Sequence, residues 1–322
     1  MKKFIVPVVI VIVLGILTVS SPHLTRFWQH LSEESRPNTG GNHAIEPAKD
    51  PAKNKPAPSP GETPPPKPGS MDSPDYVPPA SPSPQTGHDQ PVDKQDKTVY
   101  SWWFKRSAEN NTPIFDPGVV AMVKGKGLYL GNTSAKKIYL TFDEGYENGY
   151  TPEILDTLKA NQVKAAFFVT ADFVNKQPDL VRRMAAEGHI IGNHTATHPS
   201  LPKLTDREIE TEINTTHEKV SALTGISMEF MRPPMGEYNL RVLDEVNSLD
   251  YKAVFWSLAY RDWEVDKQPG REAAFNNVIE NLHPGAIILL HAVSSSNTEA
   301  LDDIIQAAKN RGYSFGTLNE ME

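Results

Sequence analysis

Short apolar segments alternate with helix-like segments over most of this chain, and this alternation constrains the fold more than any other feature. Seven segments of strand length are expected at residues 138–142, 165–169, 189–192, 229–231, 252–256, 286–290 and 313–317. Helices are expected between them, at residues 152–161, 178–187, 206–223, 240–248, 271–281 and 298–310. Because strands that alternate with helices form a parallel sheet or barrel, we predict an α/β domain.

The expected helices begin and end at residues typical of such boundaries. Thr205 precedes the longest helix and Glu208 follows three residues later, which is the pattern of a capping box. Gly188, Gly225 and Gly312 stand where a helix often ends in a left-handed residue. These boundaries support one domain with its own core over residues 98–322.

The segment before this domain has a different composition. Of the 28 prolines in the chain, 16 fall between Pro37 and Pro91, where no hydrophobic periodicity is visible. Such a segment cannot bury enough apolar surface to offset the entropy lost on ordering it. We therefore predict a disordered linker over residues 23–97.

The N-terminus carries a membrane-directing pattern. Lys2 and Lys3 precede an apolar run from Phe4 to Val19, close to the lower length limit of a membrane-spanning helix. Since the basic end stays in the cytoplasm, residues 1–22 are predicted to be a single-pass anchor with the domain outside the cytoplasmic membrane. The alternative is a cleaved signal peptide, in which case the domain would be secreted.

Charge and cysteine content exclude several classes of function. The formal net charge is −8 and the sequence pI is about 5.7, which does not fit a nucleic-acid-binding protein. Cysteine is absent, so there are no disulfides and any metal must be held by histidine and carboxylate side chains. We expect a monomer.

Polar side chains follow five of the expected strands. In chain order they are Asp143, Glu144, His194, His198, Arg232, Asp262 and His291. The carboxyl ends of parallel strands meet at one edge, where barrel enzymes place their catalytic groups. Five strand ends that each supply a group useful in hydrolysis therefore predict a catalytic site.

Two of these residues have the spacing of metal ligands. His194 and His198 are four residues apart, so both imidazoles can face one ion. The spacing alone does not establish a metal site, but the acidic pair Asp143-Glu144 at another strand end strengthens the prediction. Two histidines and one carboxylate leave positions open for water and substrate.

These residues lie in five ordered motifs: Asp143-Glu144, HTATH, RPPMG, RDW and LLH. The set resembles that of the NodB-type polysaccharide deacetylases, carbohydrate esterase family 4, over residues 136–322. The stretches GYENGYT, WSLAYRDW and LLHAVSSSNTEAL are most similar to the delta-lactam-forming peptidoglycan N-deacetylases of that family. The resemblance implies a distorted (β/α) barrel of about seven strands, the NodB homology domain, and metal-dependent N-deacetylation.

The resemblance also implies an acid–base role for four residues. Asp143 would be the general base, and Arg232 would orient it and restrain its charge. His291 would be the general acid for the leaving amine, and Asp262 would tune it. This chemistry is physically sound, since an amide needs both a proton acceptor for water and a proton donor for nitrogen.

The metal ligands follow from the same resemblance, whereas the substrate contacts are suggested by residue type and position. Glu144, His194 and His198 would ligate a divalent cation, zinc in the first instance, with other divalent ions open. Most of the family has Asp at the position of Glu144, whose extra methylene puts its ligand geometry in question. The backbone N–H near Met235 would stabilise an oxyanion. The substrate groove would be walled by Trp263 and contacted by Tyr146 or Tyr260.

Three functions are compatible with these motifs. The first is an extracytoplasmic metal-dependent N-deacetylase of peptidoglycan glycan strands that acts on N-acetylmuramic acid. The second is a deacetylase of N-acetylglucosamine in peptidoglycan or of chitooligosaccharides. The third is a non-catalytic glycan-binding protein with a decayed groove, motivated by Glu144, Met235 and Ala259.

Overall fold

The computed structural model describes residues 93–107 and 110–321 of the chain. The predicted anchor, residues 1–22, and most of the predicted linker lie outside the described residues. Within the described ranges, no helix combines the length and apolar character needed to cross a bilayer. The carbonyl of Asp96 accepts hydrogen bonds from Asn239 and Arg241, so the chain contacts the folded domain two residues before the predicted boundary at 98.

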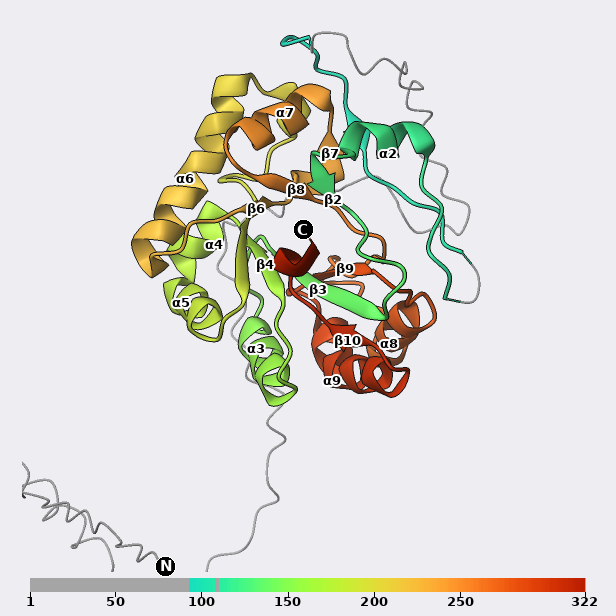
Figure 1. Cartoon of the computed structure of the whole chain (residues 1–322). Helices are drawn as coiled ribbons and strands as arrows, with labels where there is room; N and C mark the ends of the chain where they lie inside the picture. The colour runs from blue at the N-terminus through green and yellow to red at the C-terminus, as the bar shows by residue number, and fades with distance from the viewer. Residues whose placement is uncertain (1–92, 108–109, 322) are drawn as a thin grey trace, which may run out of the picture. The chain divides into compact units, whose positions relative to one another are not determined.

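A curled parallel sheet forms the centre of the described domain (Figure 1). Its eight strands in the described residues are β2 (Gly127–Leu128), β3 (Lys137–Glu144), β4 (Ala166–Val169), β5 (Ile190–Asn193), β6 (Phe230–Met231), β8 (Lys252–Val254), β9 (Ile287–His291) and β10 (Ser314–Phe315). The order is β10-β3-β4-β5-β6-β8-β2, with β9 paired to β3. All seven predicted strands are present, and β2 is an additional edge strand.

The sheet curls towards closure through isolated bridges to the β9 segment. Leu258, which follows β8, forms a parallel bridge with Ile288 of β9. This bridge connects the β8 side of the sheet to the strand that lies beside β3. The curled parallel sheet agrees with the predicted (β/α) architecture. A separate antiparallel pair, β1 (Tyr100–Ser101) with β7 (Glu237–Tyr238), ties the leading segment to the domain.

Helices cover the outside of the curled sheet (Figure 1). They are α2 (Pro117–Val123), α3 (Thr151–Ala160), α4 (Ala171–Lys176), α5 (Pro178–Ala186), α6 (Asp206–Thr224), α7 (Leu240–Ser248), α8 (Arg271–Ile279) and α9 (Ser295–Asn310). The six predicted helices are confirmed, whereas the short α2 and α4 were not predicted. The capping box of Thr205 and Glu208 is formed, and Gly225 ends α6 with a φ of 75°.

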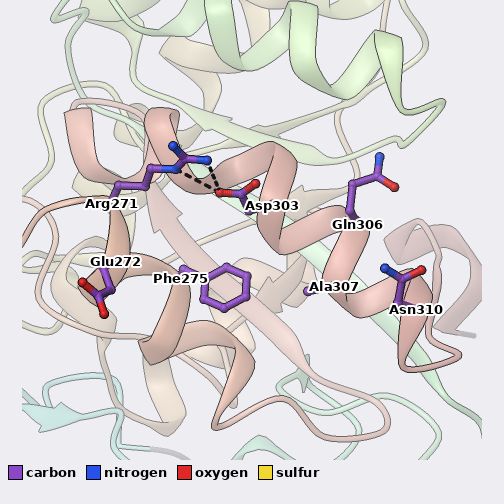
Figure 2. A pocket seen from close by; sticks show the side chains of 7 residues that line it. All are labelled: Arg271, Glu272, Phe275, Asp303, Gln306, Ala307 and Asn310. Carbon is purple, nitrogen blue, oxygen red and sulfur yellow. Dashed lines mark hydrogen bonds and ion pairs between the residues drawn. The ribbon is translucent and has the colours of Figure 1, made fainter.

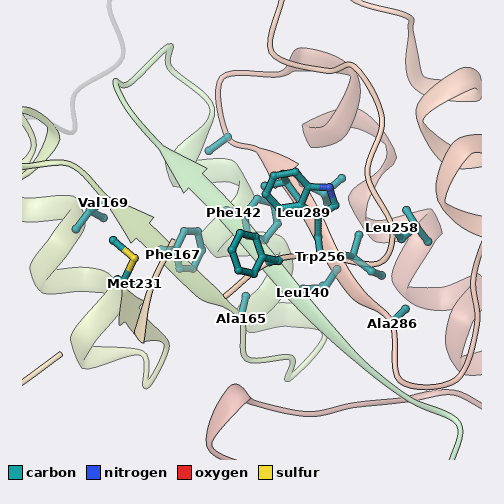
Figure 3. Close-up of a cluster of buried hydrophobic side chains, with 14 of the residues drawn as sticks. Leu140, Phe142, Ala165, Phe167, Val169, Met231, Trp256, Leu258, Ala286 and Leu289 are labelled. Carbon is teal, nitrogen blue, oxygen red and sulfur yellow. The ribbon is translucent and has the colours of Figure 1, made fainter. Parts of the chain in front are cut away.

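The two faces of β3 contact different cores. Leu140 and Phe142 belong to the larger core between sheet and helices, and the ring of Phe142 stacks on that of Phe167 at 5.2 Å (Figure 3). Tyr139, one residue from Leu140, belongs instead to a smaller interior cluster. Its other buried members are Ala166, Phe168, Phe230, Val254, Ile287 and Leu318. Because successive strand residues face opposite sides, Asp143 shares the interior face with Tyr139.

The interior is tightly packed beneath the carboxyl ends of the strands. A Cβ atom on Gly192 of β5 would lie 2.5 Å from the ring of Phe168, so the close approach requires glycine. The guanidinium carbon of Arg232 lies 4.2 Å from the centre of the same ring. The polar site is therefore built on top of a filled apolar interior.

Candidate active site

The predicted base and acid lie next to each other at the carboxyl edge of the sheet. Asp143 is the seventh residue of β3, and His291 is the last residue of β9. The two strands are parallel neighbours whose register pairs Asp143 directly with His291. The fold thus brings together two residues that are 148 positions apart in the chain.

The guanidinium of Arg232 binds the carboxylate of Asp143. Its Nη1 donates to Asp143 Oδ1 at 2.7 Å, its Nη2 to Thr141 Oγ1 at 2.8 Å and its Nε to the carbonyl of Val254 at 3.1 Å. The guanidinium is fully buried, and Thr141 was not singled out by the sequence because its role depends on the fold. The predicted contact between Asp143 and Arg232 is confirmed.

This arrangement determines the charge of Asp143. Burial alone would raise the pKa of the Asp143 carboxyl, but the Arg232 guanidinium outweighs it. The charge of His291 contributes in the same direction, so the pKa of Asp143 lies below its ordinary value. Asp143 is therefore ionised at neutral pH, the form that can accept a proton from water.

Asp262 favours the protonated state of the His291 imidazole. Its Oδ1 lies 2.7 Å from His291 Nδ1, and its Oδ2 accepts from the backbone N–H of His291 at 2.8 Å. Burial alone would lower the pKa of the His291 imidazole, but the charge of Asp262 and its hydrogen bond raise it above the ordinary value. His291 therefore favours the protonated form, which can donate to a leaving nitrogen.

The two candidate metal ligands lie beside Asp143. His194 Nδ1 donates to the carbonyl of Arg232 at 2.8 Å, which leaves Nε2 free to face Asp143 Oδ2 at 3.6 Å. The ring of His198 lies 4.8 Å from that of His194, centre to centre. Burial lowers the pKa of His194, and it lowers that of His198 to about 3. Both rings are thus neutral, as metal ligands must be.

A residue outside the motifs holds the loop that carries these histidines. Glu212 of α6 accepts hydrogen bonds from the backbone N–H groups of Ala196 at 2.9 Å and Thr197 at 2.8 Å. Its other oxygen accepts from the Thr197 hydroxyl at 2.7 Å. The loop needs this support because Thr195 and His198 adopt left-handed backbone conformations, with φ of 67° and 59°. Sequence reasoning missed Glu212, since nothing distinguishes it from other acids of α6.

Glu144 does not join the histidines. It is fully buried, and the Thr151 hydroxyl at the start of α3 lies 3.3 and 3.4 Å from its carboxylate oxygens. Burial and the neighbouring Glu147 raise the pKa of Glu144 well above its ordinary value. In residues 93–107 and 110–321, no group of three His, Asp or Glu side chains is arranged to hold a metal. Strand alternation explains this, because Glu144 shares the helix-facing side of β3 with Phe142.

The residues predicted to contact substrate differ in their position relative to the site. The ring of Trp263 lies 5.4 Å from that of His291, centre to centre, so it stands at the edge of the site. Met235 lies in a tight turn after Arg232 with a φ of 58°, and Tyr146 is half-buried in the loop after β3. Their substrate roles stay predictions. A sugar contact by Tyr260 is wrong, because this residue is buried and its hydroxyl donates to Asn297.

A separate hollow lies on the outside of the domain. It has a volume of about 560 Å³ and lies between α8 and α9, where Figure 2 shows the Arg271–Asp303 ion pair above the ring of Phe275. Its lining residues are Arg271, Glu272, Phe275, Asp303, Gln306, Ala307 and Asn310. None of them belongs to the carboxyl edge, so this hollow is distinct from the candidate active site.

Comparison with known proteins finds relatives of this chain among the polysaccharide deacetylases. The family profile of polysaccharide deacetylases matches residues 130–254. Peptidoglycan-N-acetylmuramic acid deacetylase PdaA of Bacillus subtilis is 46% identical over 223 residues, which cover 69% of this chain and 85% of that protein. Its solved structure, described as a family 4 carbohydrate esterase, superposes with a TM-score of 0.68 over 70% of this chain and 97% of that one, at 44% identity.

A second relative differs in the sugar that its name specifies. The peptidoglycan-N-acetylglucosamine deacetylase of Bacillus cereus is 38% identical over 197 residues. The match covers 60% of this chain and 70% of that protein.

Proposed function

The chain belongs to the polysaccharide deacetylase family, the family 4 carbohydrate esterases, and from this we propose that it removes the acetyl group of N-acetylmuramic acid in peptidoglycan. The observation that carries the reaction is the paired placement of Asp143 and His291, held in opposite charge states on adjacent strands. The name of the Bacillus subtilis relative supports the choice of sugar.

The residues of this chain supply both proton transfers. Asp143 takes a proton from the attacking water while the water oxygen bonds to the acetamide carbon. His291 then donates its proton to the nitrogen as the C–N bond breaks, which releases acetate and leaves a free amine on the sugar. Arg232 keeps the base ionised and Asp262 keeps the acid protonated, so each proton moves in the productive direction.

A divalent metal ion, zinc in the first instance, fits the donors of His194 and His198. Both rings are neutral, and Nε2 of His194 faces Asp143 Oδ2 at 3.6 Å. When bound, such an ion polarises the acetamide carbonyl and lowers the pKa of a bound water. Glu144 faces α3, so we assign it no ligand role here.

The N-terminal sequence supports a location outside the cytoplasmic membrane. We propose that residues 1–22 anchor the chain in the cytoplasmic membrane, with the domain facing the cell wall. The proline-rich linker would let the domain reach glycan strands at a distance from the membrane. Protease digestion of intact cells tests this, because a domain on the outer side would be removed while the cells stay sealed.

Product analysis tests the reaction and the sugar together. The purified full-length chain is incubated with peptidoglycan glycan strands, with and without a chelator, and the muropeptides are analysed by mass spectrometry. We expect acetate release, free amines on muramic acid and loss of turnover with the chelator. Absence of release with every divalent metal tried would contradict the enzymatic function and favour a glycan-binding protein.

The second candidate is deacetylation of N-acetylglucosamine. The observation that favours it is the 38% identity to the Bacillus cereus enzyme with that name. The same spectra separate the two, since the free amine would then appear on glucosamine and muramic acid would stay acetylated.

A further inference from the structure

We propose that Asn297 is a positioning residue that clamps the Asp262–His291 pair, and that Tyr260 fixes its amide. The inference deepens the proposed function, because it concerns the pair that would protonate the leaving amine. Asn297 lies in the first turn of α9, six residues after His291, within the stretch LLHAVSSSNTEAL but outside the five ordered motifs. Its side chain is buried at the rear of the site.

One amide group contacts both members of the pair. Asn297 Nδ2 donates to Asp262 Oδ2 at 2.5 Å and to the backbone carbonyl of His291 at 3.1 Å. Asp262 in turn accepts from both the backbone N–H and the ring of His291. The three residues therefore form a closed set of hydrogen bonds in which neither Asp262 nor His291 can turn alone.

The orientation of the amide is unambiguous. Asp262 Oδ2 and the His291 carbonyl are both acceptors, so the NH₂ group of Asn297 must face them. Its oxygen then faces Tyr260, whose hydroxyl donates to it. Burial raises the pKa of Tyr260, which keeps this hydroxyl protonated and able to donate. Reversing the amide would place its oxygen against two acceptors, Asp262 Oδ2 and the His291 carbonyl, in a buried space.

The helix that carries Asn297 is itself fixed to the loop that carries Asp262. Ser294 caps α9, and its hydroxyl donates to Gln268 Oε1 at 2.5 Å. Gln268 Nε2 donates to the backbone carbonyl of Asp262 at 2.7 Å. This second connection runs through different atoms, so loss of the Asn297 amide should loosen the carboxylate of Asp262 without releasing the backbone.

The clamp matters because His291 lies at the open side of the site. Its side chain is 23% exposed, whereas that of Asp262 is fully buried. An exposed imidazole held by a freely rotating carboxylate would sample unproductive angles and would lose part of its charge stabilisation. A fixed carboxylate keeps Nδ1 occupied and leaves Nε2 to meet the leaving nitrogen.

The first experiment uses Asn297→Ala in the full-length chain. We expect kcat on glycan strands to fall about tenfold, since one hydrogen bond to a charged group is removed, with KM changed less than about twofold. The alkaline limb of the pH profile should move to lower pH, because a mobile Asp262 stabilises the imidazolium less. Asn281→Ala is the matched control, as its amide only donates to the Asn277 carbonyl on α8.

A second readout needs no turnover. The Nδ1 proton of His291, assigned by its loss in His291→Ala, should give a resolved downfield NMR signal in the wild type. In Asn297→Ala that signal should broaden or shift upfield, and in Tyr260→Phe it should change less. If Asn297→Ala does not fold, the Tyr260→Phe spectrum and its pH profile decide the matter alone.

The outcomes separate this inference from the proposed function. If folded Asn297→Ala shows an unchanged proton signal and an unchanged pH profile, the clamp is overturned, even if the enzyme deacetylates peptidoglycan. If Asn297→Ala does not fold, the same two results in Tyr260→Phe overturn it. A wild type without deacetylase activity would overturn the proposed function, while the NMR signal would still show whether Asn297 holds the pair.

Discussion

The two halves of the active site reach opposite charge states by different means. The base side consists of Asp143, Arg232 and Thr141, and the acid side of His291, Asp262 and Asn297. On the base side a fully buried guanidinium neutralises Asp143, whose side chain is only 8% exposed. On the acid side a buried carboxylate and a neutral amide support an imidazole that is 23% exposed. The base side is closed, whereas the acid side opens to solvent.

This difference predicts how substitutions in each half affect stability and activity. Removing a partner on the base side leaves a charge buried in a dry interior, which costs stability as well as activity. Loss of the Asn297 clamp on the acid side leaves Asp262 Oδ2 still paired with the backbone N–H of His291, so the cost should fall mainly on turnover. Substitutions on the two sides should therefore separate in the ratio of stability loss to activity loss.

The largest effect is expected for Arg232→Met. This change removes the buried guanidinium that pairs with the Asp143 carboxylate, so the free energy of unfolding should fall by about 3–5 kcal/mol and activity should be lost. Chemical denaturation measures the first and acetate release the second. Adding Asp143→Asn should restore much of the stability without restoring activity, because the buried charge is then absent.

Arg271→Met is the matched control for this prediction. Arg271 pairs with Asp303 across α8 and α9, but the two side chains are 60% and 42% exposed (Figure 2). Exposed pairs contribute less than about 1 kcal/mol, so this variant should unfold almost like the wild type. Equal losses in the two arginine variants would show that burial does not set the base side apart.

The next largest effect is the loss of turnover in variants of the base and the acid, which substrates with different leaving groups should distinguish. Asp143→Asn and His291→Ala should each lower turnover of glycan strands by at least about 10²-fold. With an N-acetyl anilide, whose nitrogen leaves with less help from an acid, the loss in His291→Ala should shrink while the loss in Asp143→Asn stays. The ratio of kcat/KM to that of the wild type measures this, and equal losses on both substrates would contradict the assigned roles.

The pH profile gives a smaller but directional effect. Activity needs Asp143 ionised and His291 protonated, and their pKa values lie below 3.8 and above 6.5 respectively. We expect kcat/KM to be flat between these values and to fall as pH rises through the pKa of His291. The stability that His291 contributes follows the same sign, since it is complete below pH 6.5 and lost through the raised pKa.

Asp262→Asn should shift one limb of this pH profile and leave the other in place. Asp262 is the main influence that raises the pKa of His291, so the alkaline limb should move to lower pH in the variant. The acid limb, which belongs to Asp143, should not move. A shift of the acid limb instead would mean that the two sides are assigned the wrong way round.

Much of this architecture could be predicted from local sequence patterns. The seven strands and six helices follow from apolar periodicity and capping residues, and the strand ends that carry Asp143, Arg232 and His291 follow from the parallel topology. Short elements such as β2 and α4 were missed, because a few residues carry too little pattern. Glu212 and Asn297 were missed for another reason: their roles arise only from contacts across the fold.

Glu144 shows the opposite failure. A role was carried over from the resemblance, although the sequence also contained the signal that argues against it. Leu140 and Phe142 are apolar and Tyr139 and Thr141 alternate with them, so the two-residue period of β3 places neighbours on opposite faces. Applied as far as the strand end, that period separates Asp143 from Glu144.

The smallest expected effect therefore tests the residue whose predicted role the structure questions most. Glu144→Gln keeps the size of the side chain and its contact with Thr151, and burial already favours the uncharged form of Glu144. We expect metal affinity, measured by calorimetry, and kcat/KM to stay within about threefold of the wild type. His198→Gln, measured alongside, should weaken metal binding strongly because it removes an imidazole donor. A comparable loss in both variants would return Glu144 to the metal site, and would mean that β3 turns at its last residue when the ion binds.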